Sequence, residues 1–267
     1  MRVPRVVFSI FFAFILTISL AAQQTTTSDP QALSLLQRSL NTLSGSQSLT
    51  DVTLSGAARR IAGSDDETGT AVLKAIASGA GRTDLSLSSG QRSEVCDLSS
   101  TTPSGAWSGP DRISHPIAFH NLLSEPAWFF PAFAIARRLS GSGYVATYIG
   151  HETRNGQAVE HVSVSQTASA PNTPGMPSFE HLTQLDFFLD STTLLPAAIS
   201  FNIHPDNNAL LDLPIEVQFG DYRAVNGAQV PYHVQKFLNN TLFLDFQTQT
   251  VTLNSGLTSP MIVSTQI

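Results

Sequence analysis

From residue 144 onward, apolar and polar side chains alternate with a period of two, the pattern of β-strands that bury one face. In residues 197–203, for example, Ile199 and Phe201 face one way, whereas Ser200 and Asn202 face the other. Similar segments elsewhere bring the expected total to about ten strands. Helical patterns do not alternate with these strands, which disfavours a parallel sheet built from β-α-β units. The pattern therefore predicts one large antiparallel sheet with an apolar face that needs a cover.

A helix is predicted ahead of the first strand and can supply part of this cover. Asp29 is a favoured N-cap residue, and Pro30 suits the first helical position. Leucines then recur at helical spacing until a glycine ends the element, and these residues are Leu33, Leu36, Leu40, Leu43 and Gly45.

Residues 1–22 have the layout of a secretory signal peptide. Arg2 and Arg5 precede an apolar stretch over residues 6–20, and small and then polar residues follow. The stretch is shorter than the roughly 20 residues of a membrane span, so we expect cleavage, with an uncleaved anchor helix as the alternative. We thus expect an exported protein, periplasmic or secreted, with one domain over residues 28–267 and no transmembrane segment in the mature chain.

The composition excludes several classes of protein. With 14 Lys and Arg against 20 Asp and Glu, the chain has no basic cluster that could neutralise nucleic-acid phosphates. Its one cysteine, Cys96, excludes a disulfide framework and a cysteine-rich metal site. A length of 267 residues fits a single all-β domain with decorated loops.

Residues 115–140 differ from the strands around them. Phe119 and Leu123 lie in a stretch with helical spacing, Pro126 interrupts it, and four aromatic residues follow within residues 128–133. We predict two short helices with a break at Pro126 or Pro131, because an interior proline removes a backbone hydrogen bond. The segment is either plain core or a lid over a cavity for an apolar ligand. Residues 99–114 and 170–177 are interpreted as loops.

Catalytic signatures are absent from the sequence. It has no Gly-x-Ser-x-Gly motif, phosphate-binding loop or dinucleotide fingerprint. The seven histidines are scattered along the chain. We therefore expect neither an enzyme nor a cofactor. A cleft that brings two histidines within hydrogen-bond reach of a carboxylate would instead favour an enzyme.

Two motifs in the C-terminal half carry a family resemblance. Residues 190–196 read DSTTLLP, and residues 219–231 read FGDYRAVNGAQVP. Asp190 suits a turn, and Asn226-Gly227 suits a tight turn whose glycine takes a positive φ. These motifs resemble those of the LolA/LppX-like superfamily of periplasmic lipoprotein carriers, most clearly over residues 144–253. The resemblance implies an unclosed β-barrel with a helical lid around an apolar cavity that holds acyl chains.

Pattern and resemblance together predict a mainly β (α+β) fold. We expect a curved antiparallel sheet that forms an unclosed half-barrel, covered on its concave face by the N-terminal helix and a short helical lid at about residues 115–140. We expect it to bind a lipid or a lipoprotein acyl chain, and a carrier that works with an envelope protein partner is one form of this function. The alternative is an envelope interaction or sensor module whose core is filled by its own side chains.

The expected cavity wall combines the aromatic residues of the lid with apolar residues of the sheet. The candidate ligand-binding residues are Phe119, Leu123, Trp128, Phe129, Phe130, Phe133, Ile199, Phe201, Val217 and Phe219.

Overall fold

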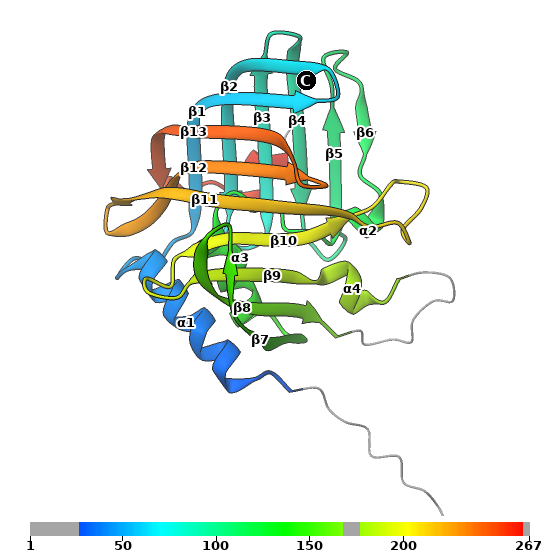
Figure 1. Cartoon of the computed structure of the whole chain (residues 1–267). Helices are drawn as coiled ribbons and strands as arrows, with labels where there is room; N and C mark the ends of the chain where they lie inside the picture. The colour runs from blue at the N-terminus through cyan, green and yellow to red at the C-terminus, as the bar shows by residue number, and fades with distance from the viewer. Residues whose placement is uncertain (1–26, 168–176, 264–267) are drawn as a thin grey trace, which may run out of the picture.

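A computed structural model of the chain describes residues 27–167 and 177–263 (Figure 1). The expected signal peptide and most of the expected loop over residues 170–177 lie outside these residues. Within them, thirteen strands form one antiparallel sheet, so the predicted fold class is confirmed and the expected number of strands was too low. No helix among residues 27–167 and 177–263 has the length and apolar character needed to cross a membrane.

The first half of the described chain contains one helix and six strands. The helix is α1 (Pro30–Ser44), and the strands are β1 (Asp51–Ala62), β2 (Asp65–Ile76), β3 (Ala80–Leu87), β4 (Gly90–Asp97), β5 (Ser104–Ser108) and β6 (Ser114–Pro116).

The second half begins with two short helices, α2 (Phe119–Leu122) and α3 (Pro131–Ser140). The remaining strands are β7 (Tyr144–Arg154), β8 (Gln157–Gln166), β9 (Leu185–Asp190), β10 (Pro196–Ile203), β11 (Leu213–Val225), β12 (Ala228–Leu238) and β13 (Thr241–Leu253). Two further helices, α4 (Phe179–Thr183) and α5 (Ser259–Val263), lie between β8 and β9 and after β13.

The order of the strands explains how the sheet is covered. It runs β6-β5-β4-β3-β2-β1-β13-β12-β11-β10-β9-β8-β7, so the chain proceeds from the centre to one edge, crosses to the other edge and returns. Figure 1 shows β3 to β6 running across the direction of β8 to β12, which makes the sheet strongly curved. Residues 117–140, called here the aromatic segment, connect the edge strand β6 to the edge strand β7. The segment that was expected to form a lid therefore connects the two edges of the sheet.

The predicted N-terminal helix is present. The side chain of Asp29 accepts a hydrogen bond from the Gln31 backbone N–H at 2.7 Å, and Gly45 ends the helix with a φ of 58°. The helix contacts α3 and β12. Its buried face is not entirely the predicted leucine row, because Leu33 is 38% exposed and Leu35 is buried in its place.

The structure corrects the prediction that residues 99–114 form a loop. β5 lies within this range and pairs with β4 from Ser93 opposite Ser108 to Asp97 opposite Ser104. The strand was missed because both of its faces are partly exposed, so its sequence, SGAWS, carries no alternation of apolar and polar residues.

Turns were easier to predict from the sequence than strand β5. Asn155-Gly156 and Asn226-Gly227 both have two successive positive φ angles, as tight hairpin turns require. The carboxylate of Asp190 accepts hydrogen bonds from the backbone of Thr192 and Thr193, at 3.1 and 2.6 Å. The turns at Asp190 and at Asn226-Gly227 were predicted from the residues alone.

The aromatic segment forms the expected two short helices. Pro131 is the first residue of α3, where its missing N–H costs no hydrogen bond. Phe129 and Phe130 are completely buried and belong to the main hydrophobic core. The segment is thus packed against the sheet and α1 along part of its length.

Candidate functional site

A cavity of about 370 Å³ lies between the sheet and the other part of the aromatic segment. Trp128 and Pro126 line it from the segment, and Phe201 lines it from β10. Cys96 also contributes to the wall, and burial raises the pKa of its thiol to about 12. This thiol is therefore an inert apolar filler.

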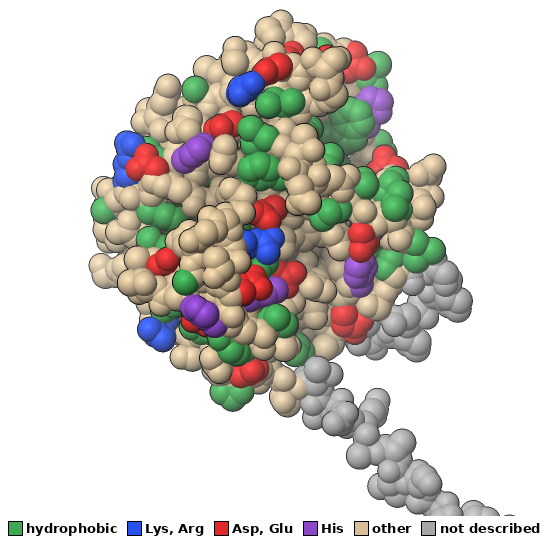
Figure 2. Space-filling model, in the orientation of Figure 1, with side chains coloured by type: hydrophobic (Ala, Val, Ile, Leu, Met, Phe, Trp, Pro, Cys, Tyr) green, Lys and Arg blue, Asp and Glu red, His purple; other side chains and the backbone are tan. Residues whose placement is uncertain are grey.

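A second cavity of about 190 Å³ adjoins the first, and both are lined by Thr83, Glu94, Trp107, Trp128 and Lys236. Leu85, Phe243 and Leu244 add apolar surface to the second cavity. Together the two form one elongated depression, called here the groove. On the face of the molecule in Figure 2, hydrophobic side chains of the described residues lie in small groups among polar ones.

Cationic side chains stand over the aromatic surface of the groove. The ammonium group of Lys236 lies 4.6 Å from the centre of the Trp128 ring, and the guanidinium of Arg60 lies 5.3 Å from that of Phe243. Arg60 and Arg92 are each 3.4 Å from the buried carboxylate of Glu67. The groove thus combines apolar side chains with charges of both signs, because Glu94, Glu125 and Asp206 also line it.

The ten predicted cavity residues fall into three groups. Trp128 and Phe201 line the groove. Phe119 is 62% exposed and Leu123 is half-buried. The other six are buried in the main core, namely Phe129, Phe130, Phe133, Ile199, Val217 and Phe219. Ligand binding by all ten stays a prediction.

A buried ion cluster fixes the aromatic segment beside the groove. Glu125 accepts hydrogen bonds from the guanidinium groups of Arg137, at 2.7 Å, and of Arg138. It also accepts one from the backbone N–H of Ala127 at 3.0 Å. Burial alone would raise the pKa of Glu125, but the two arginines outweigh it and hold this pKa at about 2. Ion pairs between Glu125 and the two arginines of α3 therefore hold the loop before α3 against this helix.

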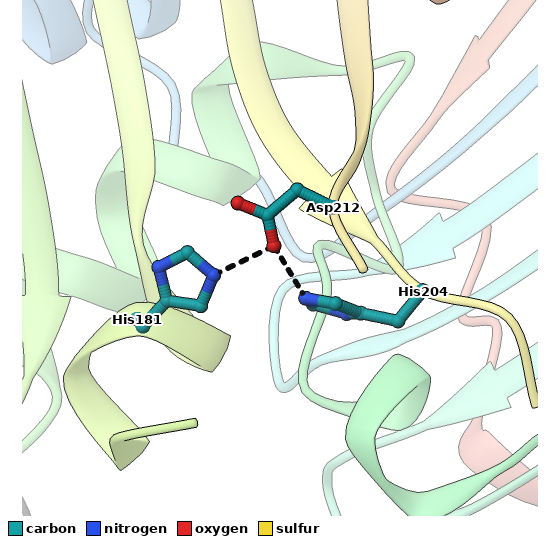
Figure 3. A group of neighbouring side chains, drawn as sticks. All are labelled: His181, His204 and Asp212. Carbon is teal, nitrogen blue, oxygen red and sulfur yellow. Dashed lines mark hydrogen bonds and ion pairs between the residues drawn. The ribbon is translucent and has the colours of Figure 1, made fainter. Parts of the chain in front are cut away.

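Three side chains that sequence reasoning missed meet at the end of the groove (Figure 3). His181 comes from α4, His204 directly follows β10, and Asp212 directly precedes β11. Oδ1 of Asp212 lies 2.9 Å from Nε2 of His181 and 3.1 Å from Nε2 of His204. The imidazole of His204 is 1% exposed and lines the larger cavity. Two histidines thus share one carboxylate, the arrangement that favours an enzyme over the expected non-enzymatic protein.

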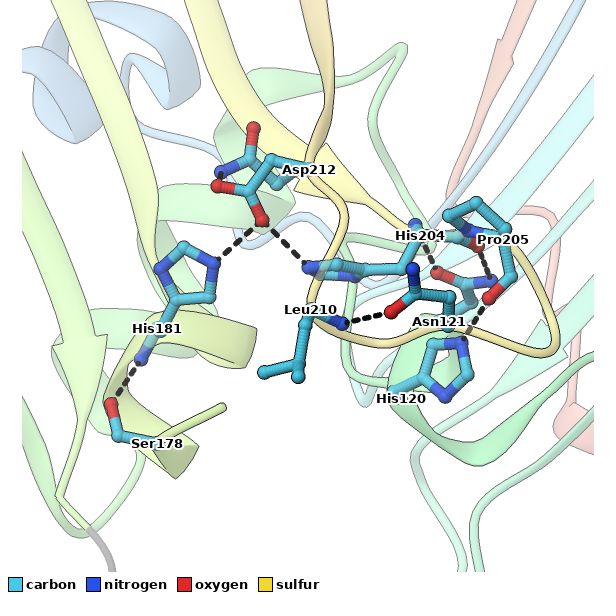
Figure 4. Close-up of polar contacts among 10 residues, drawn as sticks. His120, Asn121, Ser178, His181, His204, Pro205, Leu210 and Asp212 are labelled. Carbon is cyan, nitrogen blue, oxygen red and sulfur yellow. Dashed lines mark hydrogen bonds and ion pairs between the residues drawn. The ribbon is translucent and has the colours of Figure 1, made fainter. Parts of the chain in front are cut away.

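The position of His204 is fixed through its backbone (Figure 4). Nδ2 of Asn121 donates to the carbonyl oxygen of His204 at 2.7 Å, and the His204 N–H donates to Oδ1 of Asn121 at 2.8 Å. Nε2 of His120 lies 3.2 Å from the carbonyl oxygen of Pro205. Burial lowers the pKa of His204, which favours the neutral ring.

Similarity to known proteins is confined to structure. No family model matches the chain, and no curated protein matches its sequence. An outer membrane lipoprotein-sorting protein domain from Vibrio parahaemolyticus matches with a TM-score of 0.53 and 12% identity, over 87% of this chain and 96% of that one. A LolA superfamily protein from Nitrosomonas europaea matches with a TM-score of 0.54 and 9% identity, over 87% and 97% of the two chains.

A DUF1329 family protein from Desulfovibrio piger also matches, with a TM-score of 0.53 and 9% identity, over 89% of this chain and 98% of that one. Identities this low establish the fold alone. The resemblance carried by residues 190–231 is thereby confirmed at the level of fold. This chain is built on the unclosed half-barrel found in LolA superfamily and lipoprotein-sorting domains.

Proposed function

We propose that this protein binds the acyl chain of a lipid or an acylated lipoprotein in the groove between its sheet and its aromatic segment. The observation that carries the proposal is the makeup of the groove, whose two parts of about 370 and 190 Å³ join apolar residues to Lys236. Small-molecule sites are typically concave, mostly apolar and about 300–1,000 Å³ in volume. The groove has the volume of such a site, and Trp128, Phe201 and Phe243 supply apolar surface within a lining that also holds polar and charged residues.

The expected affinity comes mainly from the hydrocarbon. Each methylene removed from water contributes about 0.8 kcal/mol, so six buried methylenes contribute roughly 5 kcal/mol. Lys236 adds attraction for a carboxylate or phosphate near Trp128, and Glu94, which also lines the groove, disfavours a second anionic group. We therefore infer a ligand with one anionic group rather than several.

The proposed role is to hold or carry this ligand without changing it. The lipoprotein-sorting domain of similar fold supports a carrier role, and residues 1–22 support export to the periplasm or beyond. An envelope protein that loads or receives the ligand is part of the proposal.

A second candidate is an interaction or sensor module with no lipid cargo. The complete burial of Phe129 and Phe130 favours it, because the protein's own aromatic residues fill much of the space between sheet and helices.

Native mass spectrometry of the gently purified protein, followed by organic extraction, separates the two candidates. We expect a co-purified lipid or acylated peptide. Trp128→Leu alters the groove, and Phe133→Leu is the matched control because Phe133 is buried but does not line either cavity. Trp128→Leu should weaken binding of a fluorescent fatty acid at least about tenfold, since loss of large apolar contacts costs about 1.5–3 kcal/mol.

Two outcomes of these experiments would contradict the proposal. A clean apo mass together with no uptake of the fatty-acid probe would overturn lipid binding and favour the interaction module. Equal loss of probe binding in both variants, with equal loss of stability, would show that the aromatic segment acts only as core.

A further inference from the structure

One imidazole from α4 meets an imidazole and a carboxylate from the two ends of the β10–β11 connection (Figure 3). One ligand atom from each of His181, His204 and Asp212 can be chosen so that all three lie within 4.8 Å of one another. We propose that these three residues bind a divalent transition-metal ion, and that zinc is the ion that fits them best. This inference is independent of the lipid proposal.

Two of the three separations between the ligand atoms are close to those of a zinc site. Bonds of 2.0–2.1 Å in a tetrahedron place neighbouring ligand atoms about 3.3 Å apart. Oδ1 of Asp212 is already 2.9 Å from Nε2 of His181 and 3.1 Å from Nε2 of His204. All three ligand atoms lie within 4.8 Å of one another, so the two imidazoles must approach each other by at most about 1.5 Å to bind one ion.

The donor set points to zinc rather than to a hard cation. Two imidazole nitrogens with one carboxylate oxygen is the type of set found in zinc sites that keep an open position. Calcium and magnesium prefer oxygen ligands throughout. Three protein ligands leave a fourth position of a tetrahedral ion free for water or for a group of a bound molecule.

The surroundings hold two of the three ligands in place. Asn121 bonds to both backbone groups of His204 (Figure 4), and Nδ2 of Asn202 donates to the second oxygen of Asp212 at 3.0 Å. Contacts of this kind orient metal ligands and raise metal affinity. The side chains of His181 and Asp212 are 35% and 43% exposed, so an ion can enter from solvent.

The second imidazole distinguishes this cluster from an ordinary hydrogen-bonded pair. His233 pairs with Asp245 at 2.9 Å without a second histidine on that carboxylate among the contacts of the described residues. Nδ1 of His204 is buried and has no hydrogen-bond partner within the described residues. Zinc at Nε2 would leave that N–H unsatisfied, so we expect an affinity below that of structural zinc sites.

The test uses metal-free protein that carries no histidine tag. Calorimetric titration with zinc chloride should give one ion per chain, and cobalt chloride should give the intense visible absorption of a tetrahedral Co²⁺ site. His181→Ala and Asp212→Asn should each weaken zinc binding at least about tenfold. His233→Ala, which removes a comparable histidine from another pair, should leave zinc binding unchanged.

Thermal unfolding keeps the test independent of folding defects. Zinc should raise the melting temperature of the unaltered protein and of His233→Ala but not of His181→Ala, because only a ligand bound to the native state stabilises it. His181 is partly exposed, so its loss should leave the apo melting temperature nearly unchanged. No zinc binding by the unaltered protein, or equal binding by all of the variants, would overturn the proposal.

Discussion

The ammonium group of Lys236 lies 4.6 Å from the centre of the Trp128 ring, so strand β12 and the aromatic segment meet at a cation–π contact within the groove. Both residues line both cavities. The contact places the positive charge of Lys236 directly beside the apolar ring of Trp128. A ligand in the groove would meet both residues at once.

Replacing Lys236 with methionine removes the charge and keeps most of the apolar length. We expect about fivefold weaker binding of a fluorescent fatty acid, because one charge contact contributes about 1 kcal/mol, and unchanged binding of an uncharged probe of equal chain length. Lys74→Met is the matched control, since Lys74 lies on β2 and lines neither cavity. Equal weakening for both probes would assign Lys236 a structural role only.

Replacing Glu125 with glutamine leaves Arg137 and Arg138 without their shared buried counter-charge. We expect a loss of about 3–5 kcal/mol in the free energy of unfolding, measured by urea denaturation. Asp221→Asn breaks the exposed pair with Arg223 and should cause no measurable change. Similar small effects in both variants would show that the buried cluster does not stabilise the aromatic segment.

The same carboxylate makes stability depend on pH in acid. The pKa of Glu125 is about 2 in the folded protein against an ordinary 4.5, so between these values the unfolded chain binds more protons than the native state. Its contribution is complete above pH 4.5 and is lost as the pH falls toward 2. Urea midpoints measured across this interval should fall less steeply for Glu125→Gln than for the unaltered protein.

Other carboxylates set the remaining acid sensitivity. Burial raises the pKa of Asp97 and Asp186, but hydrogen bonds outweigh burial and lower both values overall. The Glu125→Gln variant should therefore keep part of the acid dependence. If the urea midpoint of Glu125→Gln fell with pH as steeply as that of the unaltered protein, Glu125 would not be a source of the acid dependence.

Gly81 lets the aromatic segment approach the sheet. A Cβ atom at this position would lie 2.2 Å from the carbonyl oxygen of Pro126, so Gly81→Ala must displace the segment from β3. We expect a loss of about 1–3 kcal/mol in stability together with altered fatty-acid binding. At Gly220 the nearest atom to such a Cβ would be 3.9 Å away, so Gly220→Ala is the control and should leave probe binding unchanged.

Features set by neighbouring residues were the ones that could be predicted. The turn at Asn226-Gly227 and the cap at Asp29 depend on a few adjacent positions. β5 was missed because its pairing with β4, rather than its own pattern, makes it a strand. Trp128 and Phe201 were predicted as cavity residues and do line the groove. Phe129 and Phe130 were predicted in the same way but are completely buried, because residue type alone does not separate a cavity wall from a core.

The histidine cluster could not be predicted, because nothing in the sequence relates His181 to its other members. His204 and Asp212 lie at the two ends of the β10–β11 connection, but only the folded sheet brings His181 on α4 beside them. The role of Lys236 was equally hidden, because a lone lysine in a strand is usually a solvated residue. Its place in the groove depends on a cation–π contact with Trp128, which lies more than 100 positions earlier in the chain.

The pairing of β1 with β13 also has a kinetic consequence. One side of β1 can pair with β2 early, but its other side stays open until the last strand of the sheet arrives. Closing so long a loop is slow, and an open strand edge can pair with a wrong partner. A chain that emerges N-terminus first, from a ribosome or through a membrane, therefore keeps an open strand edge at the centre of the future sheet until β13 has also emerged.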